Sequence, residues 1–437
     1  MKISVIGCGY LGAVHAASMA HLGHDVIGID VDPGKVQSLA AAQAPFFEPG
    51  LDEILVSATN TGRLRFSTDI AEIKGSQLHF VAVGTPQRKG ENAADLTYVS
   101  GAIEAMLPHL SEGDLVVGKS TVPVGTADKL AARIRDFGPG ASLAWNPEFL
   151  REGFAVKDTI APDRLVYGLP DGEDRPRAKA LLDEVYATAV SKDTPSIVTD
   201  YVTAELVKVS ANAFLATKIS FINAMAEIAE VTGADVTALA DAIGHDNRIG
   251  RRFLNAGIGF GGGCLPKDIR AFSARAEELG RGESVAFLKE VDNINLRRRE
   301  RMVELVVESL GGQAYKKKVA VLGLAFKPHS DDVRDSPALD VAVRLHGLGA
   351  HVIATDPQAI PNSIRLHPQL GFATDTDDAL HQADAVALVT EWDQYRALDP
   401  VEVGELVREK LMIDGRNVLD PHAWRSAGWT YRGMGRP

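Results

Sequence analysis

The stretch "ISVIGCGYLGAVHAASMAHLGHDVIGID", residues 3–30, carries the clearest structural signal in the chain. Its order of apolar strand, glycine turn, helix and second apolar strand is that of one βαβ unit. Gly7, Gly9 and Gly12 follow the first strand with the spacing G-x-G-x-x-G, which lets backbone amides and a helix N-terminus face a pyrophosphate. The stretch therefore predicts a parallel sheet that binds a dinucleotide.

Asp30 ends the second strand, 23 residues after Gly7, where an acidic side chain can accept hydrogen bonds from the two ribose hydroxyls. A carboxylate at this place repels a 2′-phosphate, so the sequence favours NAD over NADP. Lys35 is basic and leaves NADP open as an alternative.

A second glycine motif, "GDLVVGKS" at residues 113–120, matches the P-loop expression G-x-x-x-x-G-K-[ST]. Its variable positions are mostly Leu and Val, which is typical of a buried strand, and Pro123 interrupts the helix that a P-loop requires. We therefore expect no ATP site here. The overlapping "KSTVPVGT", residues 119–126, is predicted to be a loop at the carboxyl end of a strand, where α/β sheets hold ligands.

Residues 199–233 change the pattern, because they run for about 30 residues without internal proline or glycine. They predict a helix roughly 45 Å long, capped by Thr199 or Asp200 and ended by Gly233. We expect such a helix to bridge two domains and to present a face to another subunit.

The alternation of strands and helices resumes with "VAVLGLAFK", "HVIATD" and "ADAVALVT", residues 319–327, 351–356 and 383–390. Residues 373–390 align without a gap with residues 67–84, and both segments have aspartate at the third position. The alignment predicts a second doubly wound domain. Because this domain lacks the third glycine spacing after its first strand, we expect it to bind a nucleotide differently, or none.

Together these patterns predict an α/β fold with two Rossmann-like, doubly wound domains joined by a long central helix. The expected boundaries are an NAD-binding domain at residues 1–198, a central helical linker and dimerisation domain with a cysteine loop at 199–310, and a C-terminal domain at 311–437.

The composition, 437 residues with 45% hydrophobic residues, is that of a globular protein with more than one core. The net charge of -12 argues against a nucleic-acid partner. Two cysteines give no disulfide framework, which favours the cytoplasm. With no basic leader before Ile3 and no apolar run approaching 18 residues, we expect neither export nor membrane insertion.

The loop "GFGGGCLPKD", residues 259–268, places Cys264 directly after three glycines. A buried structural thiol needs apolar neighbours, whereas glycines let backbone amides approach a ligand. The loop is therefore predicted to be accessible. Cys8, in contrast, fills a variable position of the first glycine turn, and we expect it to be inert.

Two further segments have polar side chains suited to chemistry. Lys208 and Asn212 lie four residues apart on the long helix, so both project from one face. In "AWNPEFLREG", residues 144–153, Glu148 follows a turn-forming Asn-Pro pair at the expected end of a strand. Taken alone, each segment is more commonly structural: the first a solvated helix face and the second a surface turn.

Six motifs together resemble the UDP-glucose/GDP-mannose dehydrogenase family, in the same order and over almost the whole chain. They are "GCGYLG", "KSTVPVGT", "NPEFLREG", "ELVKVSANAFLATKISFINAMAE", "GFGGGCLPKD" and "FKPHSDDVRDSP". Within the family, residues 248–268 are most similar to the members that oxidise UDP-glucose.

The resemblance and the residues support one mechanism. Oxidation of a primary alcohol to a carboxylate removes two hydrides, and the intermediate aldehyde must first add a nucleophile. Cys264 as thiolate can form a thiohemiacetal and then a thioester, which water cleaves. The resemblance implies that Lys208 and Asn212 stabilise oxyanions, that Thr121 organises a water and that Asp268 and Glu148 act as bases, with the division between these two left open.

The resemblance also implies the binding residues. For NAD they are Gly7, Gly9, Tyr10, Leu11, Gly12, Asp30, Lys35, Thr85, Thr121, Glu152 and Arg334. For UDP-glucose they are Glu148, Phe149, Leu150, Arg151, Lys208, Asn212, Arg248, Phe253, Asn255, Gly257, Phe260, Gly261, Lys327 and Arg416. Arg248 would reach the neighbouring subunit's site, so a homodimer is expected, and the C-terminal domain would form half of the UDP pocket.

Three alternatives remain open. The same chemistry could act on GDP-mannose or UDP-N-acetylmannosamine, or the chain could be a non-catalytic sensor of NAD or a nucleotide sugar. A single-step hydroxyacid dehydrogenase has a related architecture but needs no thiol. The histidines show no spacing with cysteines or acids that would predict a metal site.

Overall fold

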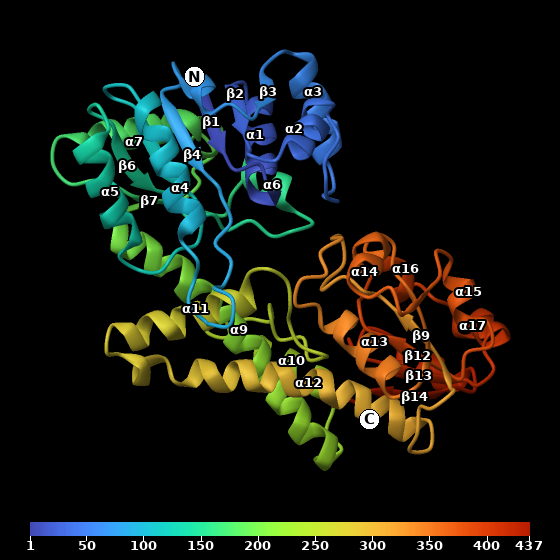
Figure 1. The fold of residues 1–437 in the computed structure, drawn as a ribbon. Coiled ribbons are helices and arrows are strands. Elements are labelled where there is room, and N and C mark those ends of the chain that lie inside the picture. The colour runs from blue at the N-terminus through green and yellow to red at the C-terminus, as the bar shows by residue number, and fades with distance from the viewer. The chain divides into compact units, whose positions relative to one another are not determined.

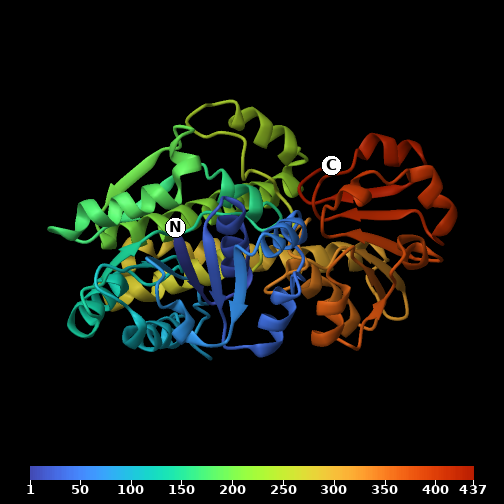
Figure 2. The same ribbon diagram turned by 90° about the horizontal axis from the view of Figure 1, so that it is seen from above.

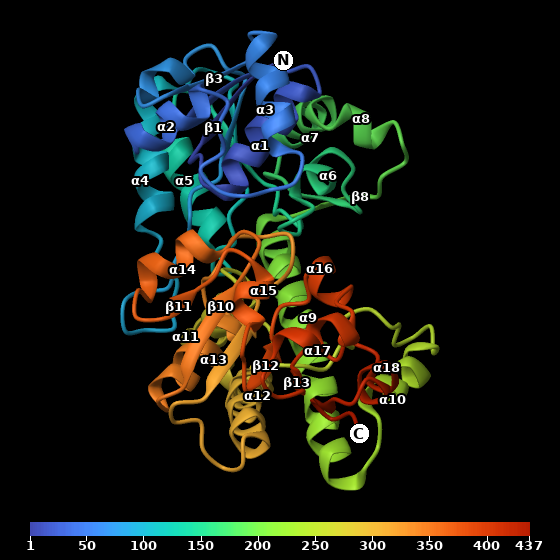
Figure 3. The same cartoon turned by 90° about the vertical axis from the view of Figure 1, so that its right-hand side faces the viewer.

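The computed structural model describes residues 1–437, which divide into two compact units (Figure 1). The N-terminal unit comprises Met1–Ala211 and Ala274–Gly280, and the C-terminal unit comprises Asn212–Ser273 and Arg281–Pro437. Each unit has its own sheet, and the helix α9 (Tyr201–Thr232) runs unbroken from one into the other, as Figure 3 shows in green. The predicted α/β fold with two doubly wound sheets and a long central helix is confirmed.

The N-terminal sheet has eight strands in the order β3-β2-β1-β4-β5-β6-β7-β8. All neighbours are parallel except β6 and β7, which meet antiparallel at Trp145 and Gly168. The first six strands follow the doubly wound order of a dinucleotide-binding domain. The strands are β1 (Lys2–Ile6), β2 (Asp25–Ile29), β3 (Leu64–Ser67), β4 (Leu78–Val81), β5 (Leu115–Gly118), β6 (Ser142–Trp145), β7 (Leu165–Gly168) and β8 (Ser196–Thr199).

Apolar residues fill both faces of this sheet, as parallel sheets covered on both sides require. On β5, Leu115 and Val117 pack into one core and Val116 packs into the other. The remaining helices of this unit are α1 (Tyr10–His21), α2 (Pro33–Ala40), α3 (Leu51–Asn60), η1 (Ile70–Ile73), α4 (Thr97–Met106), η2 (Leu107–His109), α5 (Thr126–Phe137), α6 (Ala155–Ile160), α7 (Asp174–Val185) and α8 (Ala187–Val190).

The ends of α9 follow the predicted capping residues. Asp200 Oδ1 accepts a hydrogen bond from the backbone N–H of Thr203 at 2.7 Å, which satisfies one free donor of the first turn. Gly233 follows the last turn with φ of +77°, a left-handed conformation that glycine adopts without strain. The sequence therefore predicted both the helix and its limits.

The C-terminal sheet has six parallel strands in the order β11-β10-β9-β12-β13-β14. They are β9 (Lys318–Leu322), β10 (His351–Thr355), β11 (Gly371–Phe372), β12 (Ala385–Leu388), β13 (Leu411–Asp414) and β14 (Thr430–Gly433). The aligned aspartates of the two domains have equivalent places: Asp69 caps η1, and Asp375 caps α15 (Thr376–Leu380). The helix that follows each cap leads to the strand that pairs with the first strand of its own sheet.

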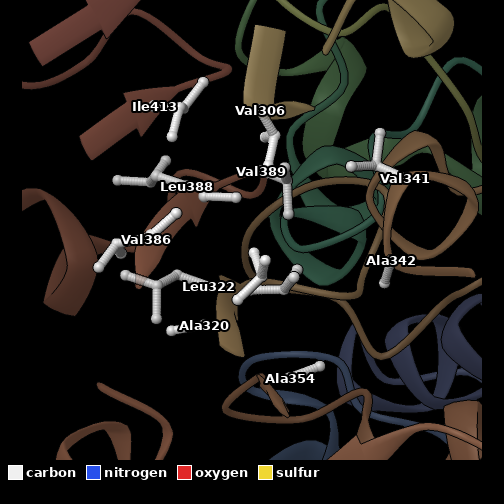
Figure 4. Packing of buried hydrophobic residues seen from close by; sticks show 14 of the residues in the cluster. Val306, Ala320, Leu322, Val341, Ala342, Ala354, Val386, Leu388, Val389 and Ile413 are labelled. Atoms are coloured by element: carbon white, nitrogen blue, oxygen red, sulfur yellow. The ribbon is translucent and has the colours of Figure 1, made fainter. Parts of the chain in front are cut away.

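Helices cover both faces of the C-terminal sheet (Figure 2). Figure 4 shows the core between them, where Leu322, Leu388 and Ile413 come from neighbouring strands and Val306 and Val341 come from covering helices. The other helices are α10 (Val236–Gly244), α11 (Leu265–Glu278), η3 (Gly282–Val285), α12 (Phe287–Ser309), α13 (Pro337–Gly347), α14 (Ile360–Leu366), α16 (Asp393–Arg396), α17 (Pro400–Leu406) and α18 (Pro421–Ser426). None of the helices is both long and apolar enough to cross a membrane.

Candidate active site

The glycine turn between β1 and α1 uses its three glycines for different purposes. Gly7 has φ of +88°, and a Cβ on Gly12 would lie 1.8 Å from the Gly7 carbonyl oxygen, so both glycines are required by the turn itself. A Cβ on Gly9 would meet no protein atom within 4 Å. The open face at Gly9, directly before the N-terminus of α1, fits the pyrophosphate of a dinucleotide.

Asp30 follows β2 and is held by several contacts. Its Oδ2 accepts from the backbone N–H of Cys8 at 2.8 Å and pairs with Lys35 Nζ at 2.9 Å. Lys35, the basic residue that could have favoured NADP, is therefore paired with Asp30, the carboxylate that favours NAD. Burial and the charge of Asp30 raise the pKa of the Cys8 thiol, so this thiol stays protonated.

Hydrogen bonds join the loops that follow β4 and β5. Thr85 Oγ1 donates to the carbonyl oxygen of Thr121 at 2.8 Å, and Ser120 Oγ donates to that of Val83 at 2.6 Å. The residues that matched the P-loop expression form β5 and the start of this loop. The loop with Thr121 thus lies at the carboxyl end of a strand, as the sequence predicted.

The loop after β6 brings together Glu148 and Lys208 of α9. Glu148 Oε1 lies 3.2 Å from Lys208 Nζ, and Glu148 Oε2 accepts from the backbone N–H of Leu150 at 2.7 Å. The side chains are 14% and 7% exposed, so the charges are only weakly screened by solvent. The Lys208 ammonium also lies 5.4 Å from the ring centroid of Phe149. The loop thus holds a largely buried carboxylate beside the cation of α9.

Glu48, which the sequence did not single out, connects the same loop to the glycine turn. Its carboxylate accepts from the backbone N–H of Gly153 at 2.7 Å and of Ala155 at 2.6 Å. The hydroxyl of Tyr10, the first residue of α1 after the glycine turn, donates to it as well. Through these bonds Glu48 orients the segment around Glu152. Glu48 lies in an irregular segment without periodicity, so no sequence pattern marks it.

Arg151, the neighbour of Glu152, is engaged in its own unit. Its guanidinium binds Asp158 of α6 through Nε–Oδ2 and Nη2–Oδ1 contacts of 2.8 and 2.6 Å. This bidentate pair fixes the loop after β6 to α6, and the Asp158 carboxylate sets the orientation of the Arg151 guanidinium.

Glu205, one turn before Lys208 on α9, is a second buried acid that the sequence did not single out. It accepts from the backbone N–H groups of Gly125 and Ala127 at 2.6 Å each, and so caps α5. Burial raises its pKa to about 7. Glu205 fixes the loop with Thr121 to the helix that carries Lys208.

In the C-terminal unit, Cys264 precedes the first residue of α11, and its carbonyl oxygen accepts from the backbone N–H of Asp268 at 2.9 Å. Its side chain is exposed, which confirms the predicted accessibility. The helix N-terminus favours a negative charge and therefore the thiolate. A Cβ on Gly263 would lie 2.5 Å from Cζ of Arg334, so the guanidinium of this arginine packs against the residue before the cysteine.

Asp268 and Asn212 are in direct contact. Asn212 Nδ2 donates to Asp268 Oδ2 at 2.6 Å, and Lys267 Nζ lies 2.6 Å from Oδ1. Asp268 is 2% exposed. On α9, Asn212 follows Lys208 by four residues, so the two project from the same face in successive turns, as predicted.

Buried polar side chains hold the loop of residues 255–261 by its backbone. Asn295 of α12 accepts from the N–H of Phe260 at 2.7 Å and donates to its carbonyl oxygen at 2.9 Å. Asn223 of α9 accepts from the N–H of Gly257 at 2.9 Å, and Arg298 donates to the Gly257 carbonyl oxygen at 3.3 Å. Sequence reasoning missed these three residues.

Arg416 follows β13 and is tied to the same loop. It donates to the carbonyl oxygens of Gly259 at 3.0 Å and Phe326 at 3.2 Å, and it pairs with Glu391 at 3.2 Å. Lys327 Nζ lies 5.2 Å from the ring centroid of its neighbour Phe326. The predicted substrate residues Lys327 and Arg416 therefore lie around one loop of the C-terminal unit.

Arg248 stands apart from these residues. Its side chain is 89% exposed, and its guanidinium pairs with Asp246 two residues earlier at 2.6 Å. Phe253, in the same segment, has φ of +65°, an uncommon left-handed conformation for a phenylalanine. Within the described chain the Arg248 side chain thus projects into solvent.

Three domains that define one protein family match successive parts of the chain. The NAD binding domain of the UDP-glucose/GDP-mannose dehydrogenase family matches residues 1–190, its central domain residues 202–297 and its UDP binding domain residues 320–421. NAD is accordingly the cofactor of the N-terminal unit, in agreement with Asp30 and the open face at Gly9.

Individual relatives extend over the whole chain. UDP-glucose 6-dehydrogenase of Rhizobium meliloti is 42% identical over 440 residues, covering 100% of both chains. The structure of a UDP-glucose dehydrogenase from Pyrobaculum islandicum matches with a TM-score of 0.90 and 40% identity, covering 100% of this chain and 98% of that one. A UDP-D-ManNAc dehydrogenase structure from Pyrococcus horikoshii matches with a TM-score of 0.85 and 27% identity, covering 100% and 99%. The chain belongs to the UDP-glucose/GDP-mannose dehydrogenase family.

Proposed function

We propose that this chain oxidises the C6 alcohol of UDP-glucose to a carboxylate, giving UDP-glucuronate and reducing two NAD in each turnover. The observation that carries the proposal is Cys264, an exposed thiol at the N-terminus of α11, directly after three glycines. A single-step alcohol oxidation needs no such nucleophile, whereas a second oxidation of the aldehyde does.

The chemistry balances as follows. Bound NAD supplies the hydride acceptor for both oxidations. The Cys264 thiolate adds to the C6 aldehyde, loss of the second hydride from the thiohemiacetal leaves a thioester, and water breaks the C–S bond. The overall change consumes one alcohol, two NAD and one water, and it yields a carboxylate, two NADH and three protons.

The proposed roles follow from the contacts of each side chain. Lys208, paired with Glu148, donates to the developing oxyanions, and Asn212 shares this role. Glu148 is the base that activates water for thioester hydrolysis, and Thr121 orients that water. Asp268, held by Asn212 and Lys267, is the second acid–base group.

Identity favours UDP-glucose among the nucleotide sugars of the family. The two UDP-glucose dehydrogenases above share 40% or more of their residues with the chain, against 27% for the UDP-D-ManNAc dehydrogenase. We assign substrate contacts to the loop of residues 255–261 with Lys327 and Arg416, and cofactor contacts to the glycine turn, Asp30 and Thr85. The expected domain boundaries, 1–198, 199–310 and 311–437, belong to the same proposal.

A homodimer is also part of the proposal. Phe214, Phe221 and Ile228 recur every seventh residue on α9 and are 66, 49 and 56% exposed, an apolar stripe suited to a second copy of the same helix. The exposed Arg248 would then reach the partner's site. We place the protein in the cytoplasm, because Cys8 and Cys264 form no disulfide.

The NADH yield tests the proposal. Purified protein with excess NAD and limiting UDP-glucose should form two NADH per sugar, and little with GDP-mannose or UDP-N-acetylmannosamine. A higher rate with another nucleotide sugar would change the substrate but keep the chemistry. One NADH per sugar would contradict the thioester mechanism, and none with any substrate would favour a sensor.

A further inference from the structure

Lys119 is a buried lysine that the proposed mechanism leaves unused. It follows β5 and is 6% exposed. Its Nζ donates to Asn146 Oδ1 at 3.0 Å and to the Tyr186 hydroxyl at 3.1 Å, which are both neutral groups. The ammonium also lies 5.5 Å from the ring centroid of Phe80. Burying a charge beside neutral partners costs free energy of folding, so packing alone does not explain a lysine at this position.

The partners of Lys119 are themselves fixed. The Tyr186 hydroxyl donates to Asn146 Oδ1 at 2.7 Å, which closes a triangle of three polar groups. Asn146 Nδ2 donates to the carbonyl oxygen of Val166 at 2.9 Å, and its backbone N–H donates to that of Gly118 at 2.8 Å. The triangle therefore joins the carboxyl ends of β5 and β6 at one point.

Each side of this junction leads to a proposed catalytic side chain. Thr121 lies two residues after Lys119, and Glu148 lies two residues after Asn146. A cavity of about 50 Å³ is lined by Lys119, Asn146, Glu148, His15 and Tyr186 among others. It is large enough for water, and on the side of Lys119, Asn146, His15 and Tyr186 its wall is buried, so charges there interact more strongly than in solvent.

The charges around the cavity alternate in sign. The Glu148 carboxylate attracts the Lys119 ammonium, while the Lys208 ammonium on α9 repels it. Asp158, Asp163 and Arg164 are the other charged residues of the cavity lining. Desolvation lowers the pKa of Lys119 to about 8. His15 of α1 is fully buried, its pKa is lowered, and it stays neutral. Burial raises the pKa of Tyr186. Lys119 thus supplies the second positive charge that acts on Glu148.

We propose that Lys119 is a positioning residue that fixes the loops of Thr121 and Glu148 to each other and, as a second cation beside Lys208, faces Glu148 across the cavity. This inference rests on the proposed thioester mechanism, in which Glu148 must be unprotonated to activate water. Without Lys119, the two loops lose their common partner, the Glu148 carboxylate loses one of its two cations, and the hydrolysis step slows.

The test compares Lys119→Met with Lys129→Met, which removes an exposed lysine from α5. We expect Lys119→Met to lower kcat by about ten- to hundredfold and to lower KM for UDP-glucose with it, so that kcat/KM stays within about threefold, because the slowed hydrolysis follows thioester formation. The acid limb of the kcat–pH profile should move up by at least about 0.5 pH unit. Lys129→Met should match the unsubstituted protein in all three readouts.

A direct readout is the intact mass of acid-quenched protein during turnover. If hydrolysis is slowed, the sugar thioester on Cys264 accumulates in Lys119→Met, which a purely structural defect would not cause. If Lys119→Met does not fold, Lys119→Gln removes the charge and keeps a donor toward Asn146. Tyr186→Phe removes a hydrogen-bond partner of Lys119 but keeps the lysine charge, so the acid limb of the kcat–pH profile should not move in this variant.

Unchanged kcat and pH profile in a folded, uncharged variant would overturn the inference. So would a loss of activity without thioester, because that points to damaged packing. Failure of the proposed function is measured on the unsubstituted protein, which would then not form two NADH per UDP-glucose. That result would also overturn the inference on Lys119.

Discussion

Asn212 of α9 donates a hydrogen bond of 2.6 Å to the carboxylate of Asp268 on α11. Asp268 lies one turn after Cys264, the proposed nucleophile, which directly precedes α11. The second carboxylate oxygen lies 2.6 Å from Lys267, so both oxygens of Asp268 are engaged. The backbone N–H of Asp268 also donates to the carbonyl oxygen of Cys264. The position of Asp268 relative to the thiol is therefore set by its own helix and by Asn212.

Asn212→Asp should replace this donor with a second carboxylate. Two carboxylates at hydrogen-bond distance cannot both be ionised, so one takes a proton at neutral pH. We expect kcat to fall by about a hundredfold or more at pH 7, with a changed kcat–pH profile. Asn60→Asp, at an exposed position of α3, is the control. Equal profiles for the two variants would remove Asn212 from the mechanism.

Gly9 and Gly12 should respond differently to alanine. Gly9→Ala adds a methyl group that meets no protein atom, so stability should be kept while NAD affinity falls by about tenfold or more. Gly12→Ala collides with the Gly7 carbonyl oxygen and should lower the Tm by about 5 °C or more. NAD titration and thermal unfolding separate the two effects. An unchanged NAD affinity in Gly9→Ala would contradict the pyrophosphate position.

Asn295→Asp should disturb the substrate loop through its backbone. The aspartate loses the donor to the Phe260 carbonyl oxygen, a bond of 2.9 Å at a fully buried position. Leaving that acceptor unpaired costs about 1–3 kcal/mol, so we expect a lower Tm and a KM for UDP-glucose raised by about tenfold. Asn293→Asp changes an exposed residue of the same helix and should leave both values unchanged. A normal KM in Asn295→Asp would argue against loop positioning.

Glu205 predicts a pH dependence of stability. Its pKa is raised from 4.5 to about 7 in the folded protein, so the folded state binds more protons than the unfolded state between these values. Stability should therefore be greatest below about pH 4.5 for this group and decline as the pH rises to 7, by on the order of 2–3 kcal/mol. Denaturant unfolding of the unsubstituted protein and of Glu205→Gln from pH 5 to 7.5 checks this. An equal slope in both proteins would contradict it.

Much of the fold was predictable because it rests on repeated local patterns. The glycine spacing with Asp30 marks one βαβ unit, the uninterrupted run from Tyr201 marks α9, and the aligned Asp69 and Asp375 mark equivalent helix caps in the two sheets. The extension of the N-terminal sheet by β7 and β8 was not predicted. It depends on the antiparallel pairing of β6 with β7, a tertiary contact that no local sequence pattern marks.

The site was predictable only where residues stand in motifs. Glu148, Lys208, Asn212 and Cys264 lie in such motifs, whereas Glu48, Glu205 and Asn295 are single polar residues in otherwise ordinary segments. Their function depends on backbone groups far away in the chain, which spacing does not reveal. Lys119 lies in a pattern that resembles a P-loop, and its burial beside Asn146 and Tyr186 depends on tertiary contacts that the pattern does not reveal.

The NADH yield of Cys264→Ser, beside Cys8→Ser as the matched control, tests the proposed mechanism. With limiting UDP-glucose and excess NAD, we expect Cys8→Ser to form two NADH per sugar, like the unsubstituted protein, because Cys8 is a buried thiol at the glycine turn. Cys264→Ser should lose sustained turnover, because no thioester can form. Sustained formation of two NADH per sugar by Cys264→Ser would contradict the mechanism.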